Sequence, residues 1–141
     1  MSAAMFAALG FTVALLVTTA YFIMGSIPLL VLQHDTPLDA RFVRGFFNLY
    51  YVAAFATATA TALSFAAAGR PGLAAGAAAL ALVAVLLRRR IIPKMDALGA
   101  QIASERIDAI AGFRRTHIAA ILINVAQLVA IVWTLVTVGR P

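Results

Sequence analysis

Four long apolar stretches alternate with three polar connections along this chain. The apolar stretches cover residues 5–32, 42–67, 73–87 and 116–138. A helix needs about 20 apolar residues to cross the hydrocarbon core of a bilayer, and only the third stretch falls short of that length. Because lipid offers no partner for free backbone groups, a spanning segment of this kind has to be helical. The pattern therefore predicts a single all-α domain, 1–141, built as a four-helix transmembrane bundle.

The longest polar connection carries a helical pattern of its own. Isoleucine and phenylalanine side chains recur there at close to the helical period, and charged residues occupy the other faces. This spacing predicts a juxtamembrane amphipathic helix over residues 97–113, which lies at the interface before the last span or runs straight into it. In the first span we expect a bend at Gly25 and Pro28, since proline removes a backbone donor. In the first connection, residues 33–41, we expect Asp39 to cap the second helix.

The composition agrees with a membrane protein and narrows its chemistry. Hydrophobic residues make up 64% of the chain and charged residues 11%, with a mean hydropathy of +1.01. The net charge of +6 belongs to residues that flank the apolar spans, so it indicates lipid contact and topology rather than nucleic acid. The absence of cysteine excludes disulfides and thiolate chemistry.

The basic residues also predict the orientation of the bundle. Nine of the eleven lie in or beside the connections 33–41 and 88–115, and the other two are Arg70 and Arg140. By the positive-inside rule the two connections face the cytoplasm and both termini face outward. We therefore expect a multi-pass protein of the cell inner (cytoplasmic) membrane.

Two predicted spans carry polar stripes that begin at the cytoplasmic end. Residues at spacings of three, four and seven share one face of a helix. If the second and fourth helices pack stripe to stripe, a polar cleft opens toward the cytoplasm, with His117 and Asn124 facing the interior toward Asn48 or Tyr51. The other interpretation is that these side chains only join the helices by hydrogen bonds. The stripe residues are Arg44, Asn48 and Tyr51 in the second span, and His117, Asn124 and Gln127 in the fourth.

Such a cleft suits a hydrophobic small molecule, and its histidine raises the question of a cofactor. His117 and His34 are the only histidines, and both are predicted on the cytoplasmic side, where they could hold copper or the iron of a haem. No spaced cluster of histidine and carboxylate residues supports such a site. We therefore expect no cofactor, with haem or copper as the alternative.

No recognisable catalytic constellation occurs in the sequence. The chain lacks a serine elbow and a phosphate-binding glycine loop. We expect a non-enzymatic accessory subunit or hydrophobic-ligand binder, forming a homo-oligomer or part of a larger membrane complex. The alternative is a redox protein or oxygenase acting on a quinone-like substrate, with His117 as proton acceptor and Asn124 as partner of the substrate oxygen.

Several short motifs follow one another in the chain. They are Ile92-Pro93-Lys94-Met95-Asp96, Phe113-x-x-x-His117, Asn124 and Gln127-Leu128, preceded by an aromatic cluster in residues 42–51. This order resembles the domain-of-unknown-function 4149 family, whose members are similar to the four-span transmembrane protein 205. The resemblance covers most of the chain and implies four spans, with His117 and Asn124 as the positions carried over.

A second resemblance is to the small four-span anthrone-oxygenase-like proteins. It rests on the first span, which contains glycine and proline, and on the last helix, which contains an asparagine. The chain reads Ile-Ile-Pro-Lys-Met-Asp where those proteins have Asn-Val-Pro-Leu-Asn.

Overall fold

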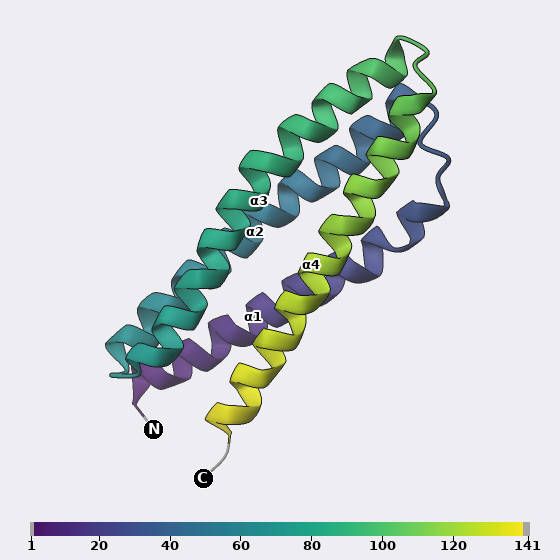
Figure 1. Cartoon of the computed structure of the whole chain (residues 1–141). Coiled ribbons are helices and arrows are strands. Elements are labelled where there is room, and N and C mark those ends of the chain that lie inside the picture. Colours follow the sequence, from purple (N-terminus) through teal and green to yellow (C-terminus); the bar gives the residue numbers. More distant parts are fainter. Residues whose placement is uncertain (1, 140–141) are drawn as a thin grey trace.

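The computed structural model describes residues 2–139, and these residues form an all-α bundle of four long helices. The helices are α1 (Ala3–Ser26), α2 (Pro37–Ala67), α3 (Pro71–Ala103) and α4 (Asp108–Val138), with a short 3-10 helix η1 (Pro28–Val31) after α1. The start of α1 and the end of α4 lie at one end of the bundle (Figure 1). The connections 32–36 and 104–107 lie at the opposite end, called the loop end below. The predicted four-helix bundle is confirmed.

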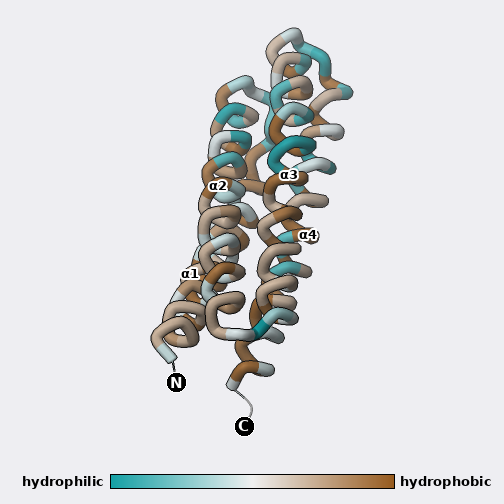
Figure 2. Tube along the Cα trace, turned by 90° about the vertical axis from the view of Figure 1, so that its left-hand side faces the viewer, coloured by the Kyte–Doolittle hydropathy of each residue, from teal (hydrophilic) through white to brown (hydrophobic). Residues whose placement is uncertain are grey.

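All four helices are long and apolar enough to cross a membrane. Hydrophobic residues predominate along the middle of the helices, and hydrophilic residues are concentrated at the loop end (Figure 2). Each helix also leaves large apolar side chains exposed, such as Tyr21 at 72% and Trp133 at 64%. In water such exposure would be costly, whereas in a bilayer these side chains meet lipid. The fold is that of a multi-pass membrane protein.

The turn between α1 and α2 follows from a few residues. The predicted bend is present, because α1 ends at Ser26 and η1 begins at Pro28. Gly25 lets α1 approach α2 closely, since an added Cβ there would lie 2.7 Å from Cζ of Phe46. The predicted cap is wrong by three residues: Thr36 caps α2 by accepting a hydrogen bond from the backbone amide of Asp39.

The separate interfacial helix predicted for residues 97–113 does not form, which corrects the sequence interpretation. The helix α3 continues through Pro93 to Ala103, a turn covers 104–107, and α4 begins at Asp108. Proline inside a helix removes one hydrogen bond, but the residues that follow gain packing. Met95 is 0% exposed and Ile102 only 5%. The helical spacing of the apolar residues was therefore interpreted correctly, but residues 97–103 belong to α3 and residues 108–113 to α4.

The helices pack in a ring that separates α2 from α4. Each of them contacts α1 and α3, while α2 and α4 lie diagonally across the bundle. The tight connection at Gly69, which has φ +69°, places α3 directly beside α2. This order decides which polar residues can meet.

Candidate functional site

The two histidines of the chain meet inside the loop end. Nδ1 of His117 and Nε2 of His34 lie 3.3 Å apart, within reach of a hydrogen bond, and both residues are 0% exposed. Their rings are nearly perpendicular, and Phe113 and Phe47 pack against them. His117 projects inward from α4, whereas His34 comes from the connection before α2.

Deeper in the bundle, α4 presents an amide to the interior. Asn124 is 0% exposed, and its Oδ1 accepts a hydrogen bond of 3.1 Å from Nε2 of Gln127. The hydroxyl of Tyr51 lies beside Asn124, although neither the hydroxyl nor the Asn124 amide nitrogen completes a hydrogen bond within the described residues. The prediction that His117 and Asn124 face the interior is confirmed, and Tyr51 is the residue of α2 beside Asn124. We call His34, Tyr51, His117 and Asn124 the buried cluster.

The other two residues of the α2 stripe face α3 rather than α4. Nε and Nη2 of Arg44 donate to the two carboxylate oxygens of Asp96 at 2.8 and 3.0 Å. One turn further along, Oδ1 of Asn48 accepts a 2.9 Å hydrogen bond from Nε of Arg88. The predicted cleft between the second and fourth helices is therefore not formed by all six residues, because Arg44 and Asn48 pair with residues of α3.

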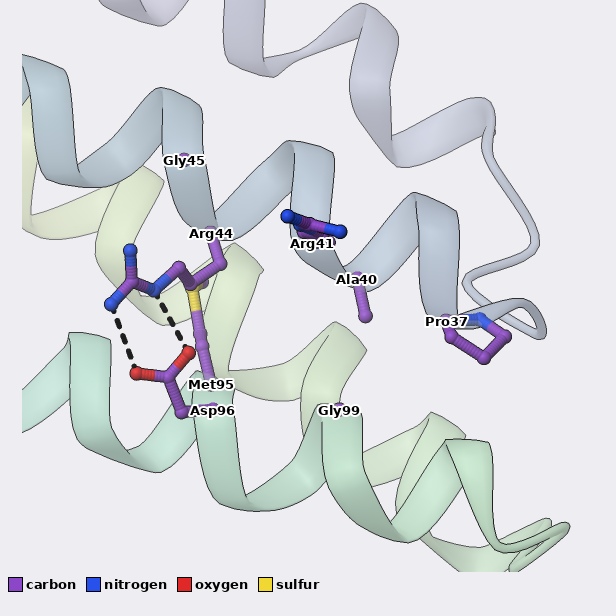
Figure 3. Close-up of a pocket in the computed structure, with 8 residues that line it drawn as sticks. All are labelled: Pro37, Ala40, Arg41, Arg44, Gly45, Met95, Asp96 and Gly99. Atoms are coloured by element: carbon purple, nitrogen blue, oxygen red, sulfur yellow. Dashed lines mark hydrogen bonds and ion pairs between the residues drawn. The ribbon is translucent and has the colours of Figure 1, made fainter.

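A polar cavity does open at the loop end, between α2 and α3. Its volume is about 380 Å³. The Arg44–Asp96 ion pair bridges the two helices, and Arg41 lies toward the start of α2 (Figure 3). Gly45 on α2 and Gly99 on α3 have no side chains and so leave space between the two helices. The cavity is lined by Pro37, Ala40, Arg41, Arg44, Gly45, Met95, Asp96 and Gly99.

A second cavity of about 260 Å³ follows along the same two helices. Its lining residues Tyr51 and Val52 come seven positions after Arg44 and Gly45, so they share a face of α2. On α3, Arg89 likewise comes seven positions before Asp96. Val52, Phe55 and Val85 form the apolar part of this cavity, which Arg88 and Arg89 also line. We call the two cavities together the α2–α3 groove.

The electrostatics of the groove are dominated by cations. Its lining contains four arginines, Arg41, Arg44, Arg88 and Arg89, against the single carboxylate of Asp96. In the described part of the chain the ion pairs join Arg44 to Asp96 and Arg106 to Asp108, so Arg41 has no carboxylate partner. The groove is therefore suited to a negatively charged group.

The geometry also bears on the cofactors considered from the sequence. A haem held by both histidines would need space between the two imidazoles, and the 3.3 Å contact between their nitrogens leaves none. Residues 2–139 contain no group of three or more His, Cys, Asp or Glu side chains arranged to hold a metal ion. The histidine pair alone supplies two nitrogen atoms.

Sequence reasoning missed two features of this end of the molecule. His34 was assigned to a polar connection, where burial is not expected, and no local pattern distinguishes it from its exposed neighbours. Asp96 was assigned to the polar connection before a separate helix over residues 97–113, so its pairing with Arg44 was not considered. The helical spacing of Asp96 to Arg88 and Arg89 on one continuous α3 could have revealed the basic groove.

Comparison with known proteins adds no assignment to this geometry. No family model matches the chain, and neither the curated proteins nor the solved structures contain a match. The two family resemblances inferred from short motifs therefore remain predictions.

Proposed function

We propose that this chain is a non-enzymatic protein of the inner membrane that binds an amphiphile with an anionic headgroup in the α2–α3 groove. In this proposal the loop end faces the cytoplasm, which the excess of arginine and lysine at that end supports. The proposal keeps the expected hydrophobic ligand and polar cleft but moves the cleft from between α2 and α4 to between α2 and α3.

The observation that carries the proposal is the alignment of a basic cavity and an apolar cavity on one face of α2. Arg41 and Arg44 lie at the polar end, and Val52 and Phe55 line the apolar end. From Arg44 to Phe55 the helix rises roughly 16 Å, which is enough for a large part of an acyl chain. A headgroup at the polar end would therefore place its chain along the apolar half.

Charge explains why the headgroup should be anionic. The carboxylate of Asp96 already contacts Nε and Nη2 of Arg44, which fixes the guanidinium in place. Arg41 remains available, and a phosphate oxygen could approach it and the outer edge of Arg44 together. A zwitterionic headgroup would bring a cation into the same basic groove and should bind more weakly.

The test is lipid binding by the purified protein in nanodiscs, measured by native mass spectrometry. Phosphatidylglycerol and phosphatidylcholine are compared for the natural chain and for the double variant Arg41→Gln/Arg44→Gln. The matched control is Arg90→Gln/Arg115→Gln, which removes the same charge from exposed positions at the same end but outside the groove. Inorganic phosphate is added in a parallel series to distinguish a headgroup from the free anion.

We expect the natural chain and the control to retain phosphatidylglycerol selectively. Each arginine near an anionic lipid surface contributes about 1 kcal/mol, so the groove variant should bind roughly thirtyfold more weakly. Equal retention by the groove variant and the control would contradict the proposal. Displacement of the lipid by inorganic phosphate at the same concentration as the lipid would show that the acyl chain contributes nothing, and would also contradict the proposal.

A further inference from the structure

The histidine pair holds the connection 32–36 against α4. Within this connection His34 is the only buried residue, while Gln33, Asp35 and Thr36 are exposed. Among the described residues, no backbone amide from 33 to 36 donates a hydrogen bond to another backbone group. Backbone hydrogen bonds hold only the two ends, Leu32 to the carbonyl of Leu29 and the carbonyl of Thr36 to the amide of Ala40. The position of residues 33–35 between them therefore depends on the side chain of His34.

The backbone of His34 is itself in an unfavourable conformation. Its φ of 59° lies in the left-handed region, which costs non-glycine residues energy, although histidine occurs there more often than most. The burial of the ring against Phe113 and its contact with His117 offset that cost. If either contact is weakened, the segment has little else to keep it closed.

We propose that the His34–His117 pair is an acid-sensitive latch: it is closed when both rings are neutral, and protonation releases residues 32–36 from α4. The neutral pair needs one N–H donor and one nitrogen acceptor. A first added proton goes to the outer nitrogen of the donor ring and places a charge at a fully buried pair. A second proton makes both facing nitrogens donors, and the hydrogen bond between the rings is lost.

The charges around the pair set the direction of this response. Burial is the largest effect and the guanidinium of Arg114, on α4, is the second, and both lower the pKa of His34 below its ordinary value. Asp39 on α2 and Asp35 in the connection itself raise the pKa of His34 by smaller amounts, as does the backbone carbonyl of Leu32. The closed pair therefore binds protons less readily than the open segment.

Because the open and closed forms bind protons with different affinity, the equilibrium between them depends on pH. An exposed histidine titrates near pH 6.5, so the open form gains protons first as the pH falls below about 6.5. The ratio of open to closed molecules then rises by up to about tenfold per pH unit for one histidine, and levels off once the closed form is also protonated. Above this window the latch stays closed.

The experiment measures the distance between two spin labels as the pH is lowered. The chain has no cysteine, so labels can be attached at Gln33→Cys in the connection and Ser104→Cys in the turn before α4, both exposed positions. In nanodiscs we expect one narrow distance distribution at about pH 8 and a second, longer population by about pH 5. An unchanged distribution across this range would overturn the proposal.

Variants test whether the histidines are responsible. In His34→Asn/His117→Gln neither position titrates, and asparagine tolerates the left-handed backbone, so the distance should not depend on pH. In the natural background, Arg114→Gln should reduce the opening in acid and Asp35→Asn should increase it, because they move the pKa of His34 in opposite directions. Acid opening in the double histidine variant equal to that of the natural chain, or the same response in both charge variants, would contradict the latch.

Discussion

The buried cluster and the α2–α3 groove share Tyr51 of α2 but have opposite environments. His34, His117 and Asn124 are each 0% exposed, whereas the side chains of Arg44 and Asp96 are 35% and 54% exposed. Tyr51 separates the two regions, since it lines the apolar cavity and also lies beside Asn124. Polarity alone therefore does not mark a binding site in this bundle. In the cluster, polar groups contact one another, while in the groove cations remain accessible.

The largest expected effect comes from removing a ring of the buried cluster. His117→Ala would delete the contact with His34 and the packing against Phe47, and should lower the free energy of unfolding by about 3 kcal/mol, as other large-to-small changes in packed interiors do. Arg44→Ala, at the groove, should cost less than about 1 kcal/mol. Unfolding in mixed detergent micelles measures both. An equal loss of unfolding free energy in the two variants would contradict the distinction between the buried cluster and the groove.

A substitution that fills the groove should act on binding and leave stability unchanged. Gly45 lines the polar cavity, and no atom lies within 4 Å of a Cβ placed there. Gly45→Leu should therefore occupy the headgroup position without a clash and weaken phosphatidylglycerol binding by about tenfold, or 1.4 kcal/mol.

The control for this substitution is Gly72→Leu, another glycine with open space around it but at the opposite end of the bundle. It should leave lipid binding as it is. If both leucine variants lose the lipid to the same extent, the loss does not report on the groove.

The smallest expected effect is that of Asp96→Asn. Because the ion pair with Arg44 is partly exposed, its loss should change the free energy of unfolding by no more than about 0.5 kcal/mol. Phosphatidylglycerol should bind somewhat more tightly, since the guanidinium no longer has a competing carboxylate. Lipid titration in nanodiscs checks the direction, and weaker binding would show that Arg44 needs Asp96 to hold it in position for the lipid.

The sequence predicted the architecture because membrane spans impose strong patterns. Apolar length located the four helices, and the spacing of His117 and Asn124 correctly predicted that both face inward. One failure lies after residue 87, where the third span was predicted to end. That prediction divided α3, which continues through Pro93 to Ala103, and left Asp96 outside the helix that contacts Arg44.

The site was only partly predictable because helical spacing tells which residues share a face and not which neighbour that face meets. Arg44, Asn48 and Tyr51 were correctly grouped on one side of α2, but the helix order places α3 next to Arg44 and Asn48. The burial of His34 depends on how a non-helical segment folds back, which no periodic pattern encodes.

The most direct test of the central claim is to map where an anionic lipid lies on the protein. A phosphatidylglycerol analogue with a photoreactive group near the end of one acyl chain is crosslinked in nanodiscs, and the labelled residues are identified by mass spectrometry. We predict labelling concentrated at Val52, Phe55 and Val85, reduced by excess phosphatidylglycerol but not by phosphatidylcholine. Labelling spread equally over exposed residues of α4, such as Leu122 and Val129, or equal competition by both lipids, would contradict the account.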